Sequence, residues 1–247
     1  GRPAQFATAR ARALLAYLAV ESGLPHRREA LAALLWPDHP EDQARQNLSQ
    51  DLARLRRAIE DASGEHYLQV TATAVQFNPT SAGVDVTEFQ ALLAACAEHR
   101  HIDVDRCPAC IGRLRSAVAL YQGDFLHAFS LKDNQPFNEW SVYQRERLHR
   151  QALDALAILV RHALGAADYT QAQRYAQRQV ELEPWSEEGH RHLMRALAAQ
   201  GQRSAALAEF EACRRVLADE LGVGPSAETL ALYDHLRDAK EGVPPQS

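Results

Sequence analysis

The stretch PEDQARQNLSQDLARLRRAIE, residues 40–60, decides how the first part of this sequence folds. Within it Leu48, Leu52, Leu55 and Ile59 recur at intervals of four, three and four residues. This spacing places the four side chains along one side of an α-helix. The sequence therefore predicts a long amphipathic helix with one side committed to a core.

The opposite side of this helix is polar and carries little acid. Its residues are Gln46, Gln50, Ala53 and Arg57, with Ser49 and Arg54 beside them. Gln and Arg side chains match base edges in the major groove of DNA, and Ser and Arg also reach phosphates. An ordinary solvated helix face has the same composition, so the flanking sequence has to decide between the two.

Length and composition indicate a globular protein of two domains. The chain has 247 residues, of which 46% are apolar and 24% are charged, and this is typical of soluble domains with cores of their own. No run approaches the roughly 18 apolar residues of a membrane span. The amino terminus, GRPAQFATARAR, lacks the apolar segment of a signal peptide. We therefore expect a cytoplasmic protein without a membrane partner.

Charge is distributed unevenly along the chain. The net charge is -5, yet residues 1–57 hold nine Arg against six acidic residues, so this part is +3 and the remainder is -8. The basic surplus coincides with the helix over 40–60, which favours a nucleic-acid partner for that region.

The elements around this helix follow the order of a winged helix. Apolar spacing predicts helices over residues 8–21 and 26–35, ahead of the one at 40–60. Two short β-prone runs, 67–70 and 75–77, follow as a hairpin. In a winged helix the third helix enters the major groove and the hairpin lies beside the DNA backbone.

A turn-rich segment, residues 78–83, predicts a domain boundary. We therefore expect a winged-helix domain over residues 1–82 and a helical domain over 83–240. Helices are predicted over 85–96, 107–121 and 136–164.

From Gly165 onward the sequence repeats itself. The distance from Gly165 to Gly201 is 36 residues and that from Tyr175 to Phe210 is 35, close to the length of tetratricopeptide (TPR) helix pairs. The predicted fold class is therefore mainly α: a winged helix-turn-helix domain followed by a TPR-like helical repeat domain. Stacked pairs of this kind commonly bind other proteins.

Cysteine and histidine residues gather between the first two helices of the second domain. Cys96, His99, His101, Cys107 and Cys110 lie within fifteen positions. Thiolate and imidazole ligands at such spacing suit tetrahedral zinc, and four ligands leave no open position. We expect four of these five residues to hold a structural zinc ion. The sequence leaves open which His is the ligand, and a Cys107–Cys110 disulfide and unliganded thiols are the alternatives.

Enzymatic activity is not predicted. The sequence contains no GxxxxGK[ST] phosphate loop, no GxSxG elbow and no HExxH helix. The remaining histidines are scattered along the chain.

The chain resembles a known family in three stretches. Residues 6–60, FATARARALL through ARLRRAIE, are similar to the OmpR-like winged helix of SARP-type bacterial transcriptional activators. VDVTEFQALL, ALYQGDFL and FNEWSVYQRERL resemble the bacterial transcriptional activator domain (BTAD) that follows it. LEPWSEEGHRHLMRALAAQGQRSAALAEFEACRRVLADELGVGPSAETLALY is the most specific match.

This resemblance implies binding to duplex promoter DNA, with the repeats used for self-association as a homodimer or for contact with RNA polymerase or another protein. Base contacts are expected from Gln46, Gln50 and Arg54. Contacts to phosphates and the DNA backbone are expected from Arg27, Arg28, Ser49, Arg57, Thr71 and Thr73. A non-DNA-binding interaction scaffold or sensor module of a larger signalling protein is the alternative. The family's usual amino-terminal strands could be represented only by residues 1–6, so we expect a trimmed or partial chain.

Overall fold

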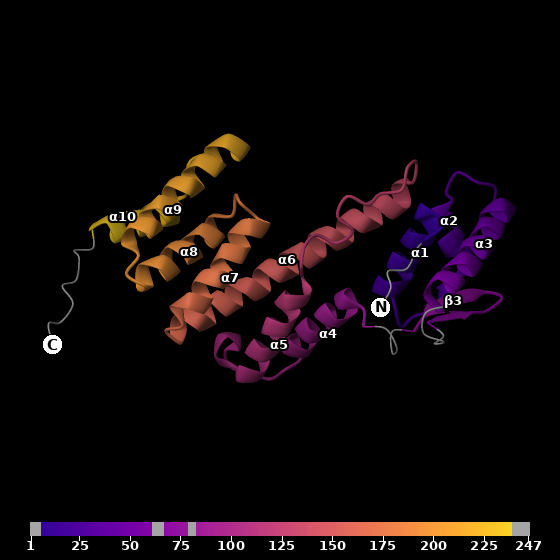
Figure 1. The fold of residues 1–247 in the computed structure, drawn as a ribbon, viewed down its shortest axis with the longest axis horizontal. Coiled ribbons are helices and arrows are strands. Elements are labelled where there is room, and N and C mark those ends of the chain that lie inside the picture. The colour runs from indigo at the N-terminus through magenta and orange to yellow at the C-terminus, as the bar shows by residue number, and fades with distance from the viewer. Residues whose placement is uncertain (1–5, 61–66, 79–82, 239–247) are drawn as a thin grey trace. The chain divides into compact units, whose positions relative to one another are not determined.

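The computed structural model describes residues 6–60, 67–78 and 83–238 (Figure 1). The described chain is mainly helical, and it divides into two compact units. The first unit comprises Gly1–Leu92 together with Ala119–His149, and the second comprises Leu93–Val118 together with Arg150–Ser247. The predicted boundary segment falls partly at 79–82, which lies outside the described residues.

The first unit is built on a winged helix. Its elements are α1 (Ala9–Val20), β1 (His26–Arg27), α2 (Arg28–Leu35), α3 (Glu41–Glu60), β2 (Leu68–Val70) and β3 (Ala74–Phe77). Helix α1 begins at the cap residue Thr8, whose hydroxyl accepts a hydrogen bond from the backbone N–H of Ala11. In α3, Leu48, Leu52 and Leu55 are buried as their spacing predicts.

The three strands form one antiparallel sheet in the order β1-β3-β2. The predicted hairpin is present, with Leu68 opposite Phe77 and Val70 opposite Val75. The prediction of a helix over 26–35 was wrong at its start, because His26 and Arg27 pair with Val75 and Ala74 of β3 instead. Helix α2 consequently begins two residues later than expected.

Residues that follow the winged helix in sequence complete its core. Leu131 and Phe137 are buried in the same cluster as Leu14, Leu18 and Leu48. Phe137 lies in the first turns of α6 (Gln135–Gly165), whose residues up to 149 belong to the first unit.

Polar contacts attach the same segment to the winged helix. The side-chain amide of Asn134 donates to the carbonyls of Leu34 and Leu35, at 3.1 and 3.0 Å. Trp140 Nε1 and Gln144 Nε2 donate to Glu21 Oε1. The first unit therefore uses residues from both sides of the expected domain boundary.

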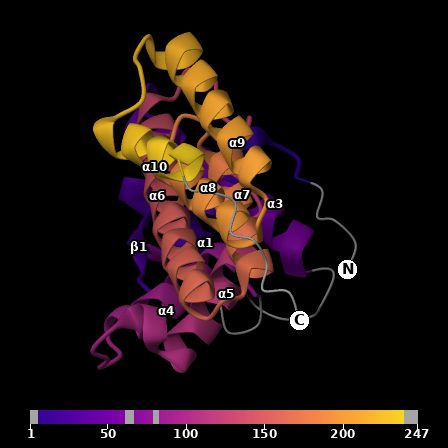
Figure 2. The same ribbon diagram turned by 90° about the vertical axis from the view of Figure 1, so that its left-hand side faces the viewer.

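The second unit is an array of helices. Its elements are the end of α4 (Asp85–Ala97), the short η2 (Val104–Arg106), most of α5 (Pro108–Leu120), the second half of α6, α7 (Tyr169–Leu182), α8 (Glu187–Ala199), α9 (Arg203–Val216), the π-helical turn η3 (Leu217–Leu221) and α10 (Ala227–Asp238). Helices α7, α8 and α9 pack in succession (Figures 1 and 2), and α10 packs on α8 and α9. Phe210 of α9 stacks on Tyr233 of α10 within this core.

Residues 1–5, where most of an amino-terminal strand would have to lie, are outside the described residues. Across the described ranges, no helix combines the length and the apolar character needed to cross a membrane.

Candidate functional site

The polar face of α3 is open to solvent. Gln46, Ser49, Gln50, Arg54 and Arg57 are all exposed. Their exposure follows from the burial of Leu48, Leu52 and Leu55 on the other side of the helix. A row of amide, hydroxyl and guanidinium groups is therefore available along the length of α3.

Arg28 connects α3 to the turn of the hairpin. Its Nη2 donates to Ser49 Oγ at 2.7 Å, and its backbone N–H donates to the carbonyl of Thr73 at 3.0 Å. Thr71 and Thr73 are exposed in the turn between β2 and β3, where Thr71 Oγ1 accepts from the N–H of Ala74 at 2.9 Å. Arg27 is the last residue of β1, and it is also exposed. The structure thus brings the start of α2, the middle of α3 and the hairpin turn together.

Within the described residues, Arg45 and Arg54 of α3 are paired with carboxylates. Arg54 pairs with Asp51 on its own helix, at 2.8 Å. Arg45 pairs with Glu41 and with Glu29 of α2. Because Arg45 already has two acidic neighbours, it offers less charge to a phosphate than Arg57, whose Nε donates to the backbone carbonyl of Ala53.

A hollow of about 350 Å³ lies beside α3 in the first unit. Gln50 and Arg54 line it together with Arg10 and Lys132. Lys132 is exposed and comes from the segment before α6. Sequence reasoning missed Lys132 because no local pattern links it to a helix almost eighty positions earlier.

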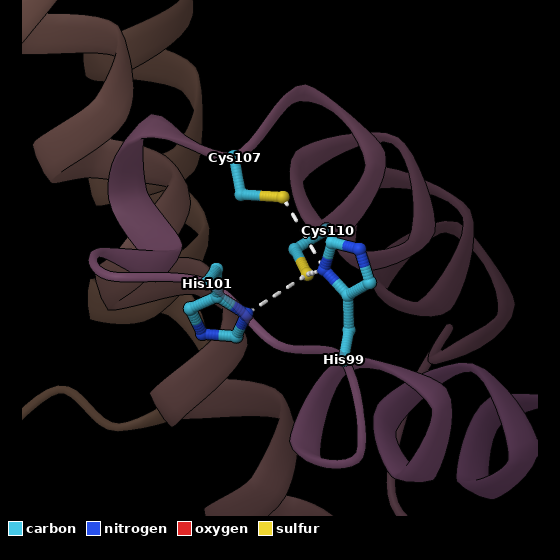
Figure 3. A group of neighbouring side chains, drawn as sticks. All are labelled: His99, His101, Cys107 and Cys110. Carbon is cyan, nitrogen blue, oxygen red and sulfur yellow. Dashed lines mark hydrogen bonds between the residues drawn. The ribbon is translucent and has the colours of Figure 1, made fainter.

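A second set of candidate side chains lies in the second unit. The ligand atoms of His99, His101, Cys107 and Cys110 all lie within 4.8 Å of one another. His99 Nδ1 is 3.5 Å from Cys107 Sγ and 3.3 Å from Cys110 Sγ, and His101 Nδ1 is 3.7 Å from Cys110 Sγ. Figure 3 shows that the four side chains point toward a common centre.

The elements of the chain explain how these four residues meet. His99 and His101 follow the end of α4, whereas Cys107 precedes α5 and Cys110 lies in its first turn. Cys96 is not part of the cluster. It is buried in α4, and its Sγ lies 3.7 Å from the carbonyl of Cys110. The structure therefore brings together four of the five candidate residues.

The two cysteines of the cluster lie in different electrostatic surroundings. A hydrogen bond from the backbone N–H of Cys110 lowers the pKa of Cys107. Burial raises the pKa of Cys110 to about 11. In the absence of a cation, Cys107 is therefore the stronger acid of the pair.

The family described as bacterial transcriptional activator domain matches residues 84–237. The chain belongs to this family. The bacterial transcriptional activator domain accounts for more than half of the sequence, and the resemblance to SARP-type activators is thereby confirmed.

Curated relatives extend the similarity over the winged helix. The chain is 28% identical over 234 residues to the regulatory protein AfsR of Streptomyces griseus, covering 93% of this chain and 22% of that protein. AfsR of Streptomyces coelicolor is 28% identical over 219 residues, covering 87% of this chain and 20% of that protein. The chain thus spans about a fifth of the length of these relatives. Both relatives are regulatory proteins by name.

A solved structure supports the fold. Mycobacterium tuberculosis EmbR, in complex with a low-affinity phosphopeptide, superposes with a TM-score of 0.66 at 20% sequence identity. The match covers 96% of this chain and 61% of the EmbR chain. The mainly α fold that the sequence predicts is confirmed by this match.

Proposed function

We propose that this chain is a DNA-binding transcriptional regulator, an activator that reads promoter duplex DNA with the outer face of α3. The observation that carries the proposal is the position of Arg28, which contacts Ser49 of α3 through its side chain and Thr73 of the hairpin turn through its backbone. These contacts join a helix face and a wing into one exposed polar surface. A winged helix presents such a surface to the major groove and the adjacent backbone.

Base reading is assigned to Gln46, Gln50 and Arg54. The three residues lie on successive turns of α3, and all are exposed. Glutamine pairs with adenine through two hydrogen bonds and arginine pairs with guanine in the same way, so each such contact discriminates between bases.

Contacts to the DNA backbone are assigned to residues around this row. Arg27, Arg28, Ser49 and Arg57 would reach phosphates, and Thr71 and Thr73 would place the wing beside the backbone. Such contacts position a protein on DNA without reading its sequence.

The helical array is assigned a role in assembly. Helices α7 to α10 would serve for self-association or for contact with RNA polymerase or another protein. Trp185 and Leu230, which are 46% and 44% exposed, offer apolar surface near the amino-terminal ends of α8 and α10. Light scattering of the chain alone and mixed with RNA polymerase would distinguish these two uses.

Fluorescence anisotropy tests the DNA-binding proposal. The full chain would be titrated against a pool of labelled promoter duplexes at two salt concentrations, since phosphate contacts make affinity fall with salt. Gln50→Ala and Arg54→Ala should each weaken binding to the preferred duplex by about 1 to 3 kcal/mol and relax sequence preference.

Matched controls come from the second unit. Gln177→Ala and Arg174→Ala remove the same side-chain types from exposed positions on α7, so both should bind as the unmodified chain does. Binding that is insensitive to Gln50→Ala and Arg54→Ala would contradict the proposed reading face. Absence of any salt-dependent binding would favour the interaction scaffold instead.

A further inference from the structure

We propose that His99, His101, Cys107 and Cys110 form a structural zinc site in the second unit. A tetrahedral zinc ion, with bonds of roughly 2.3 Å to sulfur and 2.0 Å to nitrogen, separates neighbouring ligand atoms by about 3.5 Å. Three of the four sulfur–nitrogen pairs in the cluster are 3.5, 3.3 and 3.7 Å apart, and all four ligand atoms lie within 4.8 Å of one another. The side chains are thus already spaced as the edges of a zinc coordination sphere.

The chemistry of the donors selects zinc among the common metals. Two thiolates and two imidazoles form a mixed soft and borderline set, which favours zinc over magnesium or calcium. Four protein ligands complete a tetrahedral shell and leave no position for a substrate, so the ion would hold the fold rather than carry out a reaction.

Hydrogen bonds among the four side chains satisfy only some of their close contacts. A thiol has one S–H, yet Cys110 Sγ lies within contact distance of Nδ1 of both His99 and His101. His99 Nδ1 in turn faces the sulfurs of both cysteines. A single cation at the centre satisfies all four ligand atoms at once, whereas protons satisfy only some of these pairs.

Cys96 has a different role. Its Sγ lies next to the Cys110 carbonyl, and its side chain packs with Ile111, Leu114 and Leu159 in an apolar cluster. It therefore supports the helix that carries Cys110 without contacting the ion. This arrangement assigns both histidines as ligands, a choice that sequence spacing alone leaves open.

The loop between the ligand pairs is also attached to α6. Arg161 donates to the carboxylate of Asp105 through Nε at 2.8 Å and Nη2 at 3.3 Å. His162 Nδ1 donates to the Asp105 carbonyl at 2.7 Å. The zinc ion would hold the two ends of the loop together, while Asp105 fastens its middle to the second half of α6. Loss of the ion should therefore loosen residues 98–107 and leave α8 to α10 intact.

Elemental analysis of the full chain, purified without chelator and under reducing conditions, tests the site. We expect about one zinc per chain, and replacement by Co²⁺ should give the absorption bands of tetrahedral cobalt together with a sulfur-to-cobalt charge-transfer band. Zinc content near zero, combined with no cobalt spectrum, would overturn the proposal. So would a Cys107–Cys110 disulfide in protein isolated from reducing cytoplasm, found by mass mapping after alkylation.

Single substitutions separate ligands from neighbours. His101→Ala removes an exposed ligand and should weaken zinc affinity more than tenfold with the helical circular dichroism spectrum unchanged, and Cys107→Ser should abolish stoichiometric zinc. Cys96→Ala and Cys213→Ala, which alter buried cysteines outside the cluster, should retain full zinc. Equal zinc loss in Cys96→Ala and Cys107→Ser would refute the assigned ligand set.

Hydrogen exchange provides a readout that is independent of zinc content. Chelation should increase amide exchange within residues 98–107 and at the adjoining ends of α4 and α5, with no change in α8 to α10. Unchanged exchange in the loop after complete zinc removal would contradict a structural role for the ion.

Discussion

The guanidinium of Arg54 lies 2.8 Å from the carboxylate of Asp51, one turn earlier on α3. The Asp51 side chain is only 5% exposed, whereas that of Arg54 is 41% exposed. The second carboxylate oxygen of Asp51 accepts from Thr8 Oγ1 at 3.2 Å. A buried acid thus holds a proposed base-reading arginine in place and connects α3 to the start of α1.

Asp51→Asn should destabilise the first unit. The substitution replaces two charge-assisted hydrogen bonds at a buried position, and we expect a loss of about 1 to 3 kcal/mol in the free energy of unfolding. Urea denaturation measures this change. Asp42→Asn, at an exposed position in the first turn of the same helix, should change stability by less than about 0.5 kcal/mol. Equal effects of the two substitutions would show that the Asp51 contacts contribute nothing.

Lys132→Ala should weaken DNA binding without altering sequence preference. Lys132 lines the hollow beside Gln50 and Arg54, so in the proposed complex its ammonium group would lie close to a phosphate next to the bases that α3 contacts. Loss of one phosphate contact should reduce the dependence of log affinity on log salt by about one unit. Anisotropy titrations over a salt series give this slope, and an unchanged slope would exclude a phosphate contact from Lys132.

The stability of the helical array should depend on pH through two histidines of α8. Burial alone would lower the pKa of His190, but hydrogen bonds with Glu209 and the Pro184 carbonyl outweigh burial and raise it. The raised pKa means that protonated His190 stabilises the folded state. This contribution to the free energy of unfolding is fully present below the unfolded pKa of about 6.5 and is lost as pH rises through the native pKa. Burial lowers the pKa of His192 to about 4. The contribution of neutral His192 to the free energy of unfolding is fully present above about pH 6.5. As pH falls toward 4, up to about 3 kcal/mol of this contribution is lost.

Stability of the second unit should therefore be greatest near pH 6.5. His192→Gln should remove the acidic limb of the profile and His190→Gln the basic limb. Denaturation of each variant across pH 4 to 9 checks these opposite effects. A profile whose limbs persist in both variants would mean that other groups control the pH dependence.

Asn134→Ala should destabilise the first unit although Asn134 follows the winged helix by more than fifty residues. Its amide donates to the carbonyls of Leu34 and Leu35, and its Oδ1 accepts from the Phe137 N–H at the start of α6. Because these groups are buried, we expect a loss of about 1 to 3 kcal/mol, read from urea denaturation. Gln135→Ala, at the exposed neighbouring position, is the control and should change the free energy of unfolding little. A similarly small change for Asn134→Ala would show that the contacts of Asn134 are dispensable for stability.

Local spacing predicted the winged helix well. Leucines at positions 48, 52 and 55 define the buried side of α3 regardless of what packs on them, and short β-prone runs around residues 71–74 define the hairpin. These features depend on neighbours in sequence, which is why periodicity reveals them.

Features that depend on distant partners were not predictable in the same way. His26 and Arg27 form a strand because β3, nearly fifty residues later, offers them backbone partners. The position of Lys132 beside α3 likewise depends on packing between distant segments. For the cysteine and histidine cluster, sequence spacing gave five candidate ligands. The path of the chain between α4 and α5 is needed to show that four of them converge and that Cys96 does not.

The burial of Phe137 among the leucines of the winged helix has a consequence for how such regulators recombine in evolution. Phe137 is 0% exposed, and it lies beyond both the hairpin and the start of the family match at residue 84. A gene fusion that joined residues 1–83 to a foreign effector would leave a gap in the core where this ring packs. The unit that must be inherited together is therefore larger than the winged helix, and we expect gene fusions to break the chain after the first turns of α6.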